Sequence, residues 1–246
     1  MRVLRALWRL AAATGQALGG ALICAFVFPF ITPAQRMAHV GRWSARMLRA
    51  LGIRLAVRGS VHPGPVLLVA NHISWVDILA IDAVHPARFV SKADVRRWPL
   101  IGYLVASGGT LFIERERKRD ALRVVHQIAE ALKARDIVAV FPEGTTSDGH
   151  DVLPFHANLL QAAIATEAPV QPIVLRYRDA RSAVSQAASY VGDTSLLASM
   201  WATVMAEGLV AEVFIDVAQG SRHADRRALA EHLRDGIVAR LRQEGA

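Results

Sequence analysis

A histidine and an aspartate five residues apart are the strongest candidates for chemistry in this sequence. His72 follows a strand-like apolar run, Val66–Ala70, and Asp77 begins the helix expected after it. Histidine titrates near neutral pH, so it can act as a general base when a carboxylate holds its correct tautomer. The pair therefore predicts a His–Asp general base. The same spacing also occurs where a histidine and a first-turn aspartate are only structural.

Polar residues follow a second strand-like run, residues 138–141. Residues 142–147 read Pro-Glu-Gly-Thr-Thr-Ser and include Glu143, Gly144 and Thr145. Backbone N–H groups and hydroxyls at such a turn can receive an oxyanion or a phosphate. An ordinary turn is the alternative, because proline and glycine interrupt helices and strands, and hydroxyl residues cap helices.

Three more residues are singled out by their position relative to expected strands. Arg115 follows the run 110–113. Arginine can bind phosphate through two parallel hydrogen bonds, although a solvated arginine at a strand end is the ordinary alternative. Asn71 directly precedes His72, and Pro172 lies in the run 170–175. In isolation, Pro172 indicates only that a proline begins a strand.

These residues need a scaffold, and from Leu55 onward short apolar runs alternate with helical segments. Such alternation predicts an α/β fold with a mixed, largely parallel sheet flanked by helices. Ligands of α/β sheets usually bind at the carboxyl ends of strands, and His72 follows such an end. The expected strands are residues 55–58, 66–70, 88–90, 110–113, 138–141, 170–175 and 211–217. The expected helices are residues 75–84, 119–135, 158–166 and 224–241.

The net charge of +8 is concentrated at the N-terminus. Residues 1–76 hold nine arginines and no acidic residue, which leaves 20 basic against 21 acidic residues, a net charge of −1, on the rest of the chain. A nucleic-acid partner is therefore not expected, and an anionic membrane surface fits the basic segment better. The single cysteine, Cys24, excludes an intramolecular disulfide and a cysteine metal cage.

The same N-terminal segment is apolar. Leu10–Ile31 holds 22 residues without a charge, and about 20 suffice to span a bilayer. Its glycines, Pro29 and the arginines on both flanks fit a re-entrant or interface-lying helix as well as a span. A cleaved signal peptide is a third interpretation. Residues 36–51 form a basic amphipathic pattern, which fits a membrane-surface helix or a helix packed on the domain with solvated arginines. Together with the preceding apolar run, it leads us to expect membrane-associating helices over residues 1–54 and a catalytic domain over residues 55–246.

Four segments, taken together and in order, resemble motifs of the glycerolipid acyltransferases, in the bacterial 1-acyl-glycerol-3-phosphate acyltransferase branch. The first motif is Asn-His-x4-Asp, the second an apolar strand ending in arginine, the third Phe-Pro-Glu-Gly-Thr-Thr/Ser, and the fourth a short apolar run around proline. The matching segments are residues 71–77, 112–115, 141–147 and 170–173. The resemblance covers about residues 55–217 and implies that the domain expected over residues 55–246 is an acyltransferase domain.

The resemblance implies direct attack by the hydroxyl of a lysophospholipid on the thioester of acyl-CoA or acyl-carrier protein, with neither a cofactor nor a metal. His72 would remove the hydroxyl proton, and Asp77 would orient His72. The substrate-binding residues that it implies are Asn71, Arg115, Glu143, Gly144, Thr145 and Pro172. Of these, Arg115, Glu143 and Gly144 would position the glycerol phosphate. Because a carboxylate repels phosphate, Glu143 would hold glycerol oxygens or Arg115.

One departure from the family pattern bears on the acceptor. Where relatives often have Phe-Lys-x-Gly, this chain has residues 155–158, Phe-His-Ala-Asn. Lysophosphatidic acid is the favoured acceptor, and another lyso-lipid, such as lyso-ornithine lipid, stays open. The basic arm and the resemblance together predict a membrane-associated protein at the cytoplasmic face of a bacterial inner membrane.

Two other classes of function remain as alternatives. A metal-dependent hydrolase could use His72, Asp77, Asp82 and His85 as ligands, although these four would have to converge from one helix and its ends. A noncatalytic membrane lipid-binding protein fits the arm and the core, but it gives His72 and Asp77 no role.

Overall fold

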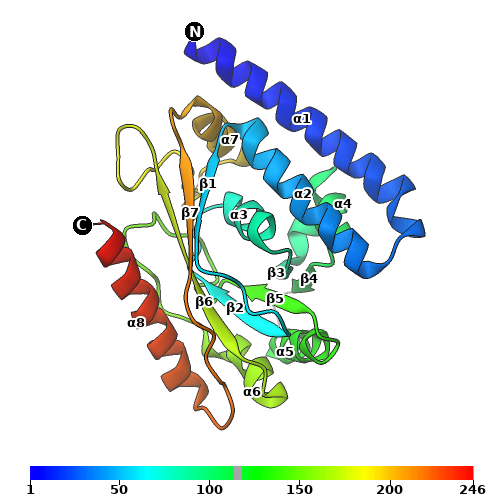
Figure 1. The fold of residues 1–246 in the computed structure, drawn as a ribbon, viewed down its shortest axis with the longest axis vertical. Coiled ribbons are helices and arrows are strands. Elements are labelled where there is room, and N and C mark those ends of the chain that lie inside the picture. The colour runs from blue at the N-terminus through cyan, green and yellow to red at the C-terminus, as the bar shows by residue number, and fades with distance from the viewer. Residues whose placement is uncertain (114–117, 246) are drawn as a thin grey trace.

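The computed structural model describes the chain except residues 114–117 and 246 (Figure 1). Within the described residues, one sheet has the strand order β1-β7-β6-β2-β5-β3-β4. All neighbouring strands run parallel except β6 and β7, which are antiparallel. The strands are β1 Arg54–Arg58, β2 Val66–Ala70, β3 Arg88–Lys92, β4 Leu111–Ile113, β5 Ile137–Val140, β6 Val170–Arg178 and β7 Val210–Ile215. The expected mixed, largely parallel sheet is confirmed.

Helices cover both faces of this sheet (Figure 1). The α-helices are α1 Arg2–Phe26, α2 Pro33–Leu51, α3 Val76–Val84, α4 Ile101–Ser107, α5 Lys118–Lys133, α6 Gln161–Thr166, α7 Leu196–Met205 and α8 Arg226–Gly245. Short 3-10 helices are η1 Phe28–Phe30, η2 Ala93–Arg97 and η3 Ala157–Leu160. The sequence pattern did not predict α4 or α7, and the expected helix 158–166 begins as η3 and continues as α6.

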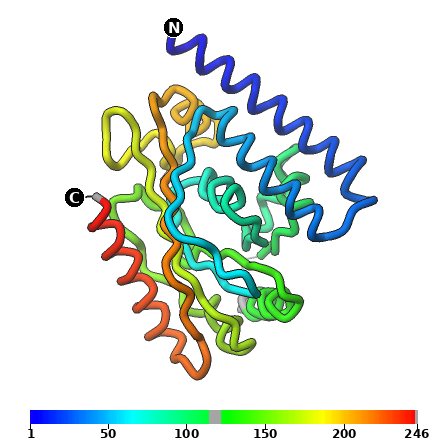
Figure 2. The backbone as a smooth tube through the Cα atoms, viewed as in Figure 1, coloured from blue at the N-terminus to red at the C-terminus, as the bar shows by residue number. Residues whose placement is uncertain are grey.

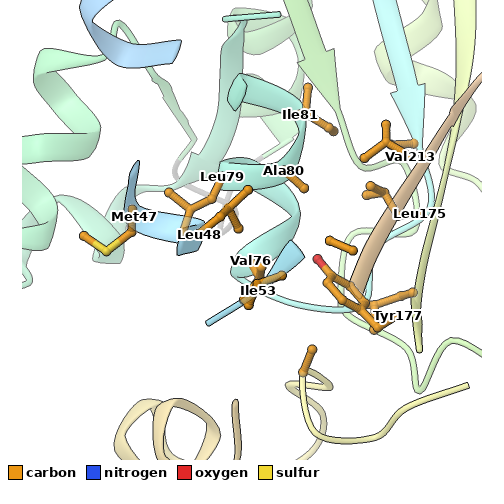
Figure 3. Close-up of a cluster of buried hydrophobic side chains, with 14 of the residues drawn as sticks. Met47, Leu48, Ile53, Val76, Leu79, Ala80, Ile81, Leu175, Tyr177 and Val213 are labelled. Atoms are coloured by element: carbon orange, nitrogen blue, oxygen red, sulfur yellow. The ribbon is translucent and has the colours of Figure 1, made fainter. Parts of the chain in front are cut away.

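Strand β2 lies in the middle of the sheet, and all five of its residues are buried. Successive side chains of a strand point to opposite faces. Accordingly Leu68 packs in the hydrophobic cluster with α2 and α3, whereas Leu67 and Val69 pack in the cluster with α5, α6 and α8. Figure 3 shows part of the first cluster, where Leu48 of α2 lies beside α3. The end of β2, which carries the His-Asp segment, is therefore fixed from both sides.

The N-terminal helices form a hairpin along one side of the molecule (Figure 2). Thr32 and Gln35 make a capping box at the start of α2. Helix α1 packs through small residues, because a Cβ added to Gly20 would lie 2.5 Å from Nε1 of Trp43 on α2. The Arg9 guanidinium donates to the carbonyl oxygens of Val204 and Ala206, which joins α1 to α7.

The other face of α1 carries large exposed apolar side chains. Among them Leu4 and Trp8 are each 74% exposed, and Phe26 is 71% exposed. The stretch Arg2–Phe30 is long and apolar enough to cross a membrane, and only 11% of its most apolar window is buried in the protein. The expected apolar N-terminal helix is therefore present. The division of the chain at residue 54 stays a prediction, and α2 shares the hydrophobic cluster of the sheet.

Candidate active site

His72 and Asp77 meet in the turn between β2 and α3. The His72 Nδ1 atom lies 2.8 Å from Oδ2 of Asp77. The Asp77 side chain is completely buried, whereas that of His72 is 20% exposed. A carboxylate only accepts hydrogen bonds, so this contact places the imidazole hydrogen on Nδ1 and the lone pair on Nε2. In the part of the chain that the structure describes, no hydrogen bond engages Nε2, which leaves it available to a substrate hydroxyl.

The start of α3 explains why Asp77 is held so firmly. Backbone N–H groups at a helix N-terminus have no intrahelical partner and favour a negative charge nearby. The Oδ2 atom of Asp77 accepts the backbone N–H groups of Ile73 at 2.7 Å and Ser74 at 2.9 Å. Trp75, at the cap position, supplies no side-chain cap. Asp77 therefore folds back from the first turn of α3, where it holds the turn that precedes the helix and orients His72 with the same oxygen.

The segment after β5 holds the backbone of His72. The Glu143 Oε1 atom accepts the N–H of His72 at 2.6 Å, and Oε2 accepts the N–H of Leu153 at 2.8 Å. The N–H of Ser147 donates to the carbonyl oxygen of His72 at 2.7 Å. Burial raises the pKa of Glu143 to about 7, even though both backbone donors oppose this shift. The third sequence motif thus fixes both polar groups of the His72 main chain.

The imidazole ring of His72 also rests on an aromatic side chain. It stacks on Phe141, with ring centroids 4.0 Å apart and an interplanar angle of 13°. Phe141 in turn stacks on Phe89 of β3, at 5.9 Å. Sequence reasoning included Phe141 in the expected strand, whereas β5 ends at Val140. Phe141 thus lies directly after the end of β5, and its ring forms a flat support for the imidazole.

Asn71 fixes the residue before His72 to the neighbouring strand. Its Nδ2 donates to the carbonyl oxygen of Leu175 at 2.9 Å, and its Oδ1 accepts the Leu175 N–H at 2.7 Å. The side chain is fully buried. Both polar groups of Asn71 are therefore engaged by β6, and contact with a substrate stays a prediction. The same holds for Glu143, whose two oxygens accept backbone N–H groups.

The other predicted substrate-binding residues differ in their placement. Gly144 follows β5 with a φ of +73°, and a Cβ there would lie 3.0 Å from the His156 ring. Thr145 is exposed in the same turn. Pro172 is buried in β6, opposite Val69 of β2. Arg115 lies outside the described residues. The structure thus places Gly144 and Thr145 in the turn that begins beside the His72 ring.

The ligand set of the alternative metal site is not brought together. The Asp82 Oδ1 atom accepts the backbone N–H of Ala87 at 3.0 Å, and burial raises the pKa of Asp82 to about 8. His85 is exposed, with Nδ1 3.1 Å from the carbonyl oxygen of Pro86. Among the described residues, no group of three or more histidine, cysteine, aspartate or glutamate side chains could hold a metal ion.

The fold recurs in a solved structure. The crystal structure of the 1-acyl-sn-glycerophosphate (LPA) acyltransferase, PlsC, from Thermotoga maritima matches with a TM-score of 0.73. The match covers 99% of this chain and 97% of that chain, at 18% sequence identity. This likeness shows that the two chains share a fold. In this chain the fold is a mixed sheet between helices, with an apolar helix at its N-terminus.

Sequence comparisons define the family. The family model described as Acyltransferase matches residues 54–176. A 1-acyl-sn-glycerol-3-phosphate acyltransferase of Neisseria gonorrhoeae is 36% identical over 190 residues, which covers 77% of this chain and 74% of the relative. A lyso-ornithine lipid O-acyltransferase of Pseudomonas aeruginosa is 36% identical over 196 residues, which covers 79% and 75%. The chain belongs to the acyltransferase family and is an enzyme of the O-acyltransferase type.

Proposed function

We propose that this enzyme transfers a fatty acyl chain from acyl-CoA or acyl-carrier protein to the hydroxyl of a lysophospholipid. The proposed acceptor is 1-acyl-glycerol-3-phosphate, and the product is phosphatidic acid. The observation that carries the proposal is the His72–Asp77 pair, with Nδ1 held at 2.8 Å and Nε2 not engaged by the described residues. Membrane-lipid acyltransferases among the relatives support the choice of substrate class.

In the proposed reaction, Nε2 of His72 takes the proton of the acceptor hydroxyl. The hydroxyl oxygen forms a bond to the thioester carbonyl carbon, the carbon–sulfur bond then breaks, and the imidazolium returns the proton to the leaving thiolate. Asp77 stabilises the imidazolium, as a buried carboxylate does in other general-base pairs. No acyl-enzyme forms. The reaction needs neither a cofactor nor a metal, because the protein supplies the base and the thioester supplies the leaving group.

Two substrates must meet at one nitrogen, so their positioning is a major part of catalysis. We assign the head group of the acceptor to the turn with Gly144 and Thr145, which starts beside the His72 ring, and to Arg115. Asn71, Glu143 and Pro172 act at this site by fixing the strand ends, because their polar or bulky groups are buried in contacts between strands and turns. The remaining face of His72 is left for the thioester.

A second acceptor is favoured by a specific observation. Relatives named lyso-ornithine lipid O-acyltransferase and 1-acyl-sn-glycerol-3-phosphate acyltransferase have the same 36% identity to this chain. In addition, a Cβ at Gly144 would lie 3.0 Å from the ring of His156, the residue that stands where the family pattern often has the lysine of Phe-Lys-x-Gly. A neutral or zwitterionic head group would need less positive charge at this point than glycerol phosphate does.

The decisive experiment measures the acceptor and the donor together. The purified protein is incubated with 1-acyl-glycerol-3-phosphate, lyso-ornithine lipid or lysophosphatidylcholine, each with labelled acyl-CoA and with labelled acyl-carrier protein, and the products are identified by mass spectrometry. We expect the highest kcat/KM with 1-acyl-glycerol-3-phosphate and no loss of activity with a chelator. Transfer only to lyso-ornithine lipid would show that this lipid, rather than 1-acyl-glycerol-3-phosphate, is the acceptor. Absence of transfer to any acceptor would contradict the proposal.

The N-terminal hairpin associates the enzyme with the membrane that contains its acceptor. Because one side of α1 packs on α2 and α7, we place α1 in the plane of the bilayer surface with its opposite, apolar side immersed. The arginines of α2 and the N-terminus would then contact anionic head groups. We assign this surface to the cytoplasmic face of the inner membrane, where acyl-CoA and acyl-carrier protein are found. Protease accessibility of α8 in inverted and right-side-out vesicles tests the assignment.

A further inference from the structure

Asp77 is held by a second element, strand β6, as well as by its own helix. The hydroxyl of Tyr177 donates to Oδ1 of Asp77 at 2.6 Å. Tyr177 is 1% exposed and is the largest fully buried side chain in the described part of the protein. In Figure 3 its oxygen points from β6 toward the start of α3, where Val76 lies. The His72–Asp77 pair is therefore linked to β6, the strand next to β2, at a residue outside all four sequence motifs.

The hydrogen-bond partners of Asp77 are divided between its two oxygens. Oδ2 faces His72 Nδ1 and accepts the N–H groups of Ile73 and Ser74. Oδ1 has Tyr177 as its hydrogen-bond donor among the described residues. A buried carboxylate oxygen that loses its donor is costly, because water cannot replace the lost hydrogen bond. Removal of the Tyr177 hydroxyl therefore acts on the carboxylate that orients His72.

Tyr177 is suited to remain a donor over the whole working pH range. Burial raises the pKa of its phenol well above the usual value, and the charge and the hydrogen bond of Asp77 raise it further. The hydroxyl consequently keeps its proton at neutral pH and below. The contact is thus a constant O–H donation to the carboxylate, and it does not relay protons itself.

The same strand also holds the residue on the other side of His72. Leu175 pairs with the side chain of Asn71, and Tyr177, two residues further along β6, reaches Asp77. Leu175 makes this contact with its backbone N–H and carbonyl groups, whereas Tyr177 uses its side-chain hydroxyl. Two successive positions on β6 therefore fix both ends of the segment that carries His72.

From these contacts, we propose that Tyr177 is a positioning residue of acyl transfer, whose hydroxyl holds Asp77 in the orientation in which its other oxygen meets His72. The inference rests on the proposed role of His72 as the general base. It extends the proposed functional unit from a His–Asp pair to a His–Asp–Tyr chain of hydrogen bonds, and it gives the buried Tyr177 side chain a role in positioning the general base.

The titratable groups around the pair set the expected pH effect. Among the described residues, Glu143 faces His72 from the turn after β5, Tyr177 faces Asp77 from β6, and His156 packs behind Gly144. Donation from Tyr177 withdraws negative charge from the Asp77 carboxylate. Without it, the carboxylate stabilises the protonated imidazolium, which cannot act as a base, more strongly. The acidic limb of the pH profile of kcat should then move to higher pH.

The primary test is Tyr177→Phe, which removes only the hydroxyl. We expect kcat to fall about tenfold with KM within twofold of the wild type, and the acidic limb to rise by about half a pH unit. Tyr103→Phe is the matched control, because Tyr103 is 46% exposed on α4, and it should leave kcat and the limb unchanged. An unchanged kcat and limb in folded Tyr177→Phe would overturn the proposal, as would an activity loss that only follows the folded fraction.

A second measurement keeps the inference testable if Tyr177→Phe does not fold. Replacement of all three tyrosines by 3-fluorotyrosine preserves the shape and makes the phenol a stronger donor. The acidic limb should then move to lower pH, opposite to the effect of Tyr177→Phe. A limb that stays in place, or moves upward, would contradict the role of the hydroxyl.

Nuclear magnetic resonance separates failure of this inference from failure of the proposed function. The titration midpoint of the His72 ring, assigned by comparison with His72→Ala, should rise in Tyr177→Phe whether or not the protein is assayed for transfer. If the midpoint moves while His72→Ala remains active, the coupling stands and the general base is wrong. If His72→Ala is inactive while the midpoint and kcat of Tyr177→Phe are normal, the general base stands and the role of Tyr177 is wrong.

Discussion

The turn that carries His72 and the outer side of α1 are built in opposite ways. Around His72, the polar side-chain atoms of Asn71, Asp77 and Glu143 all have partners inside the protein. On α1, Leu4 and other large apolar side chains are mostly exposed. A reaction that depends on one nitrogen needs a fixed geometry, whereas a helix that binds a bilayer needs apolar surface left free. The two regions therefore call for different experiments.

Substitution of Asp77 should have the largest effect among the residues that support His72. In Asp77→Asn the amide no longer stabilises an imidazolium, and it can select the wrong imidazole tautomer, so kcat should fall about 10²–10³-fold. Steady-state acyl transfer by the purified variant measures this. Asp82→Asn is the matched control on the same helix and should keep its kcat, because Asp82 contacts Ala87 rather than His72. Equal losses in the two variants would show a merely structural effect of α3.

The membrane role of α1 is tested by removing exposed apolar side chains. In the triple variant Trp8→Ser, Leu22→Ser and Phe26→Ser, affinity for anionic phospholipid vesicles should fall at least about tenfold, because each side chain contributes apolar area to the bilayer contact. Transfer to a detergent-solubilised acceptor should be retained. Leu122→Ser is the control, since Leu122 is also 74% exposed but lies on α5. Vesicle affinity equal to that of the wild type would contradict the membrane role of α1.

Substitution of Glu143 tests whether this side chain holds the backbone of His72 or contacts the substrate. Glutamine can accept only one of the two backbone N–H groups that Glu143 accepts, so Glu143→Gln should lower the free energy of unfolding by about 2 kcal/mol. The kcat should fall as well, because the His72 N–H loses part of its support. Urea unfolding and transfer kinetics measure the two effects. A variant with normal stability and a raised KM for the acceptor alone would instead indicate direct contact with the glycerol.

Asp82 supplies the smallest expected effect, on stability and not on transfer. Its pKa is raised to about 8 in the folded protein from the ordinary 3.8, so the folded state binds the proton more tightly than the unfolded state. The stability of the wild type therefore falls as pH rises from about 4 to about 8. Asp82→Asn keeps the acceptor for Ala87 without titrating. It should match the wild type near pH 4 and be the more stable of the two at pH 8 in urea unfolding.

Much of the scaffold was predictable because its sequence patterns are local. Apolar runs bounded by turn residues located the strands, and the spacing of His72 and Asp77 located the candidate base. Helix α7 was missed because it is apolar with little separation of polar and apolar faces, so its period is weak. Helix α4 was missed because it has only seven residues. Both helices are fixed by packing rather than by an intrinsic pattern.

The partners of the site residues were less predictable because they come from far along the chain. Tyr177 lies 100 residues beyond Asp77, and Leu175 lies 104 residues beyond Asn71. The expected strand 170–175 ended two residues before Tyr177, whereas β6 extends to Arg178. A buried tyrosine generally needs a hydrogen-bond partner. That signal marks Tyr177 as a polar group in the core. Its particular partner follows only from the strand order, which places β6 beside β2.

The central claim is that Nε2 of His72 removes the proton of the acceptor hydroxyl, and the most direct measurement is the turnover of His72→Ala. We expect transfer from the labelled thioester to fall about 10³-fold or more, with the thermal unfolding midpoint close to that of the wild type. His85→Ala, at an exposed histidine beyond the end of the same helix, should retain full turnover. Near-normal turnover by folded His72→Ala would contradict the mechanism.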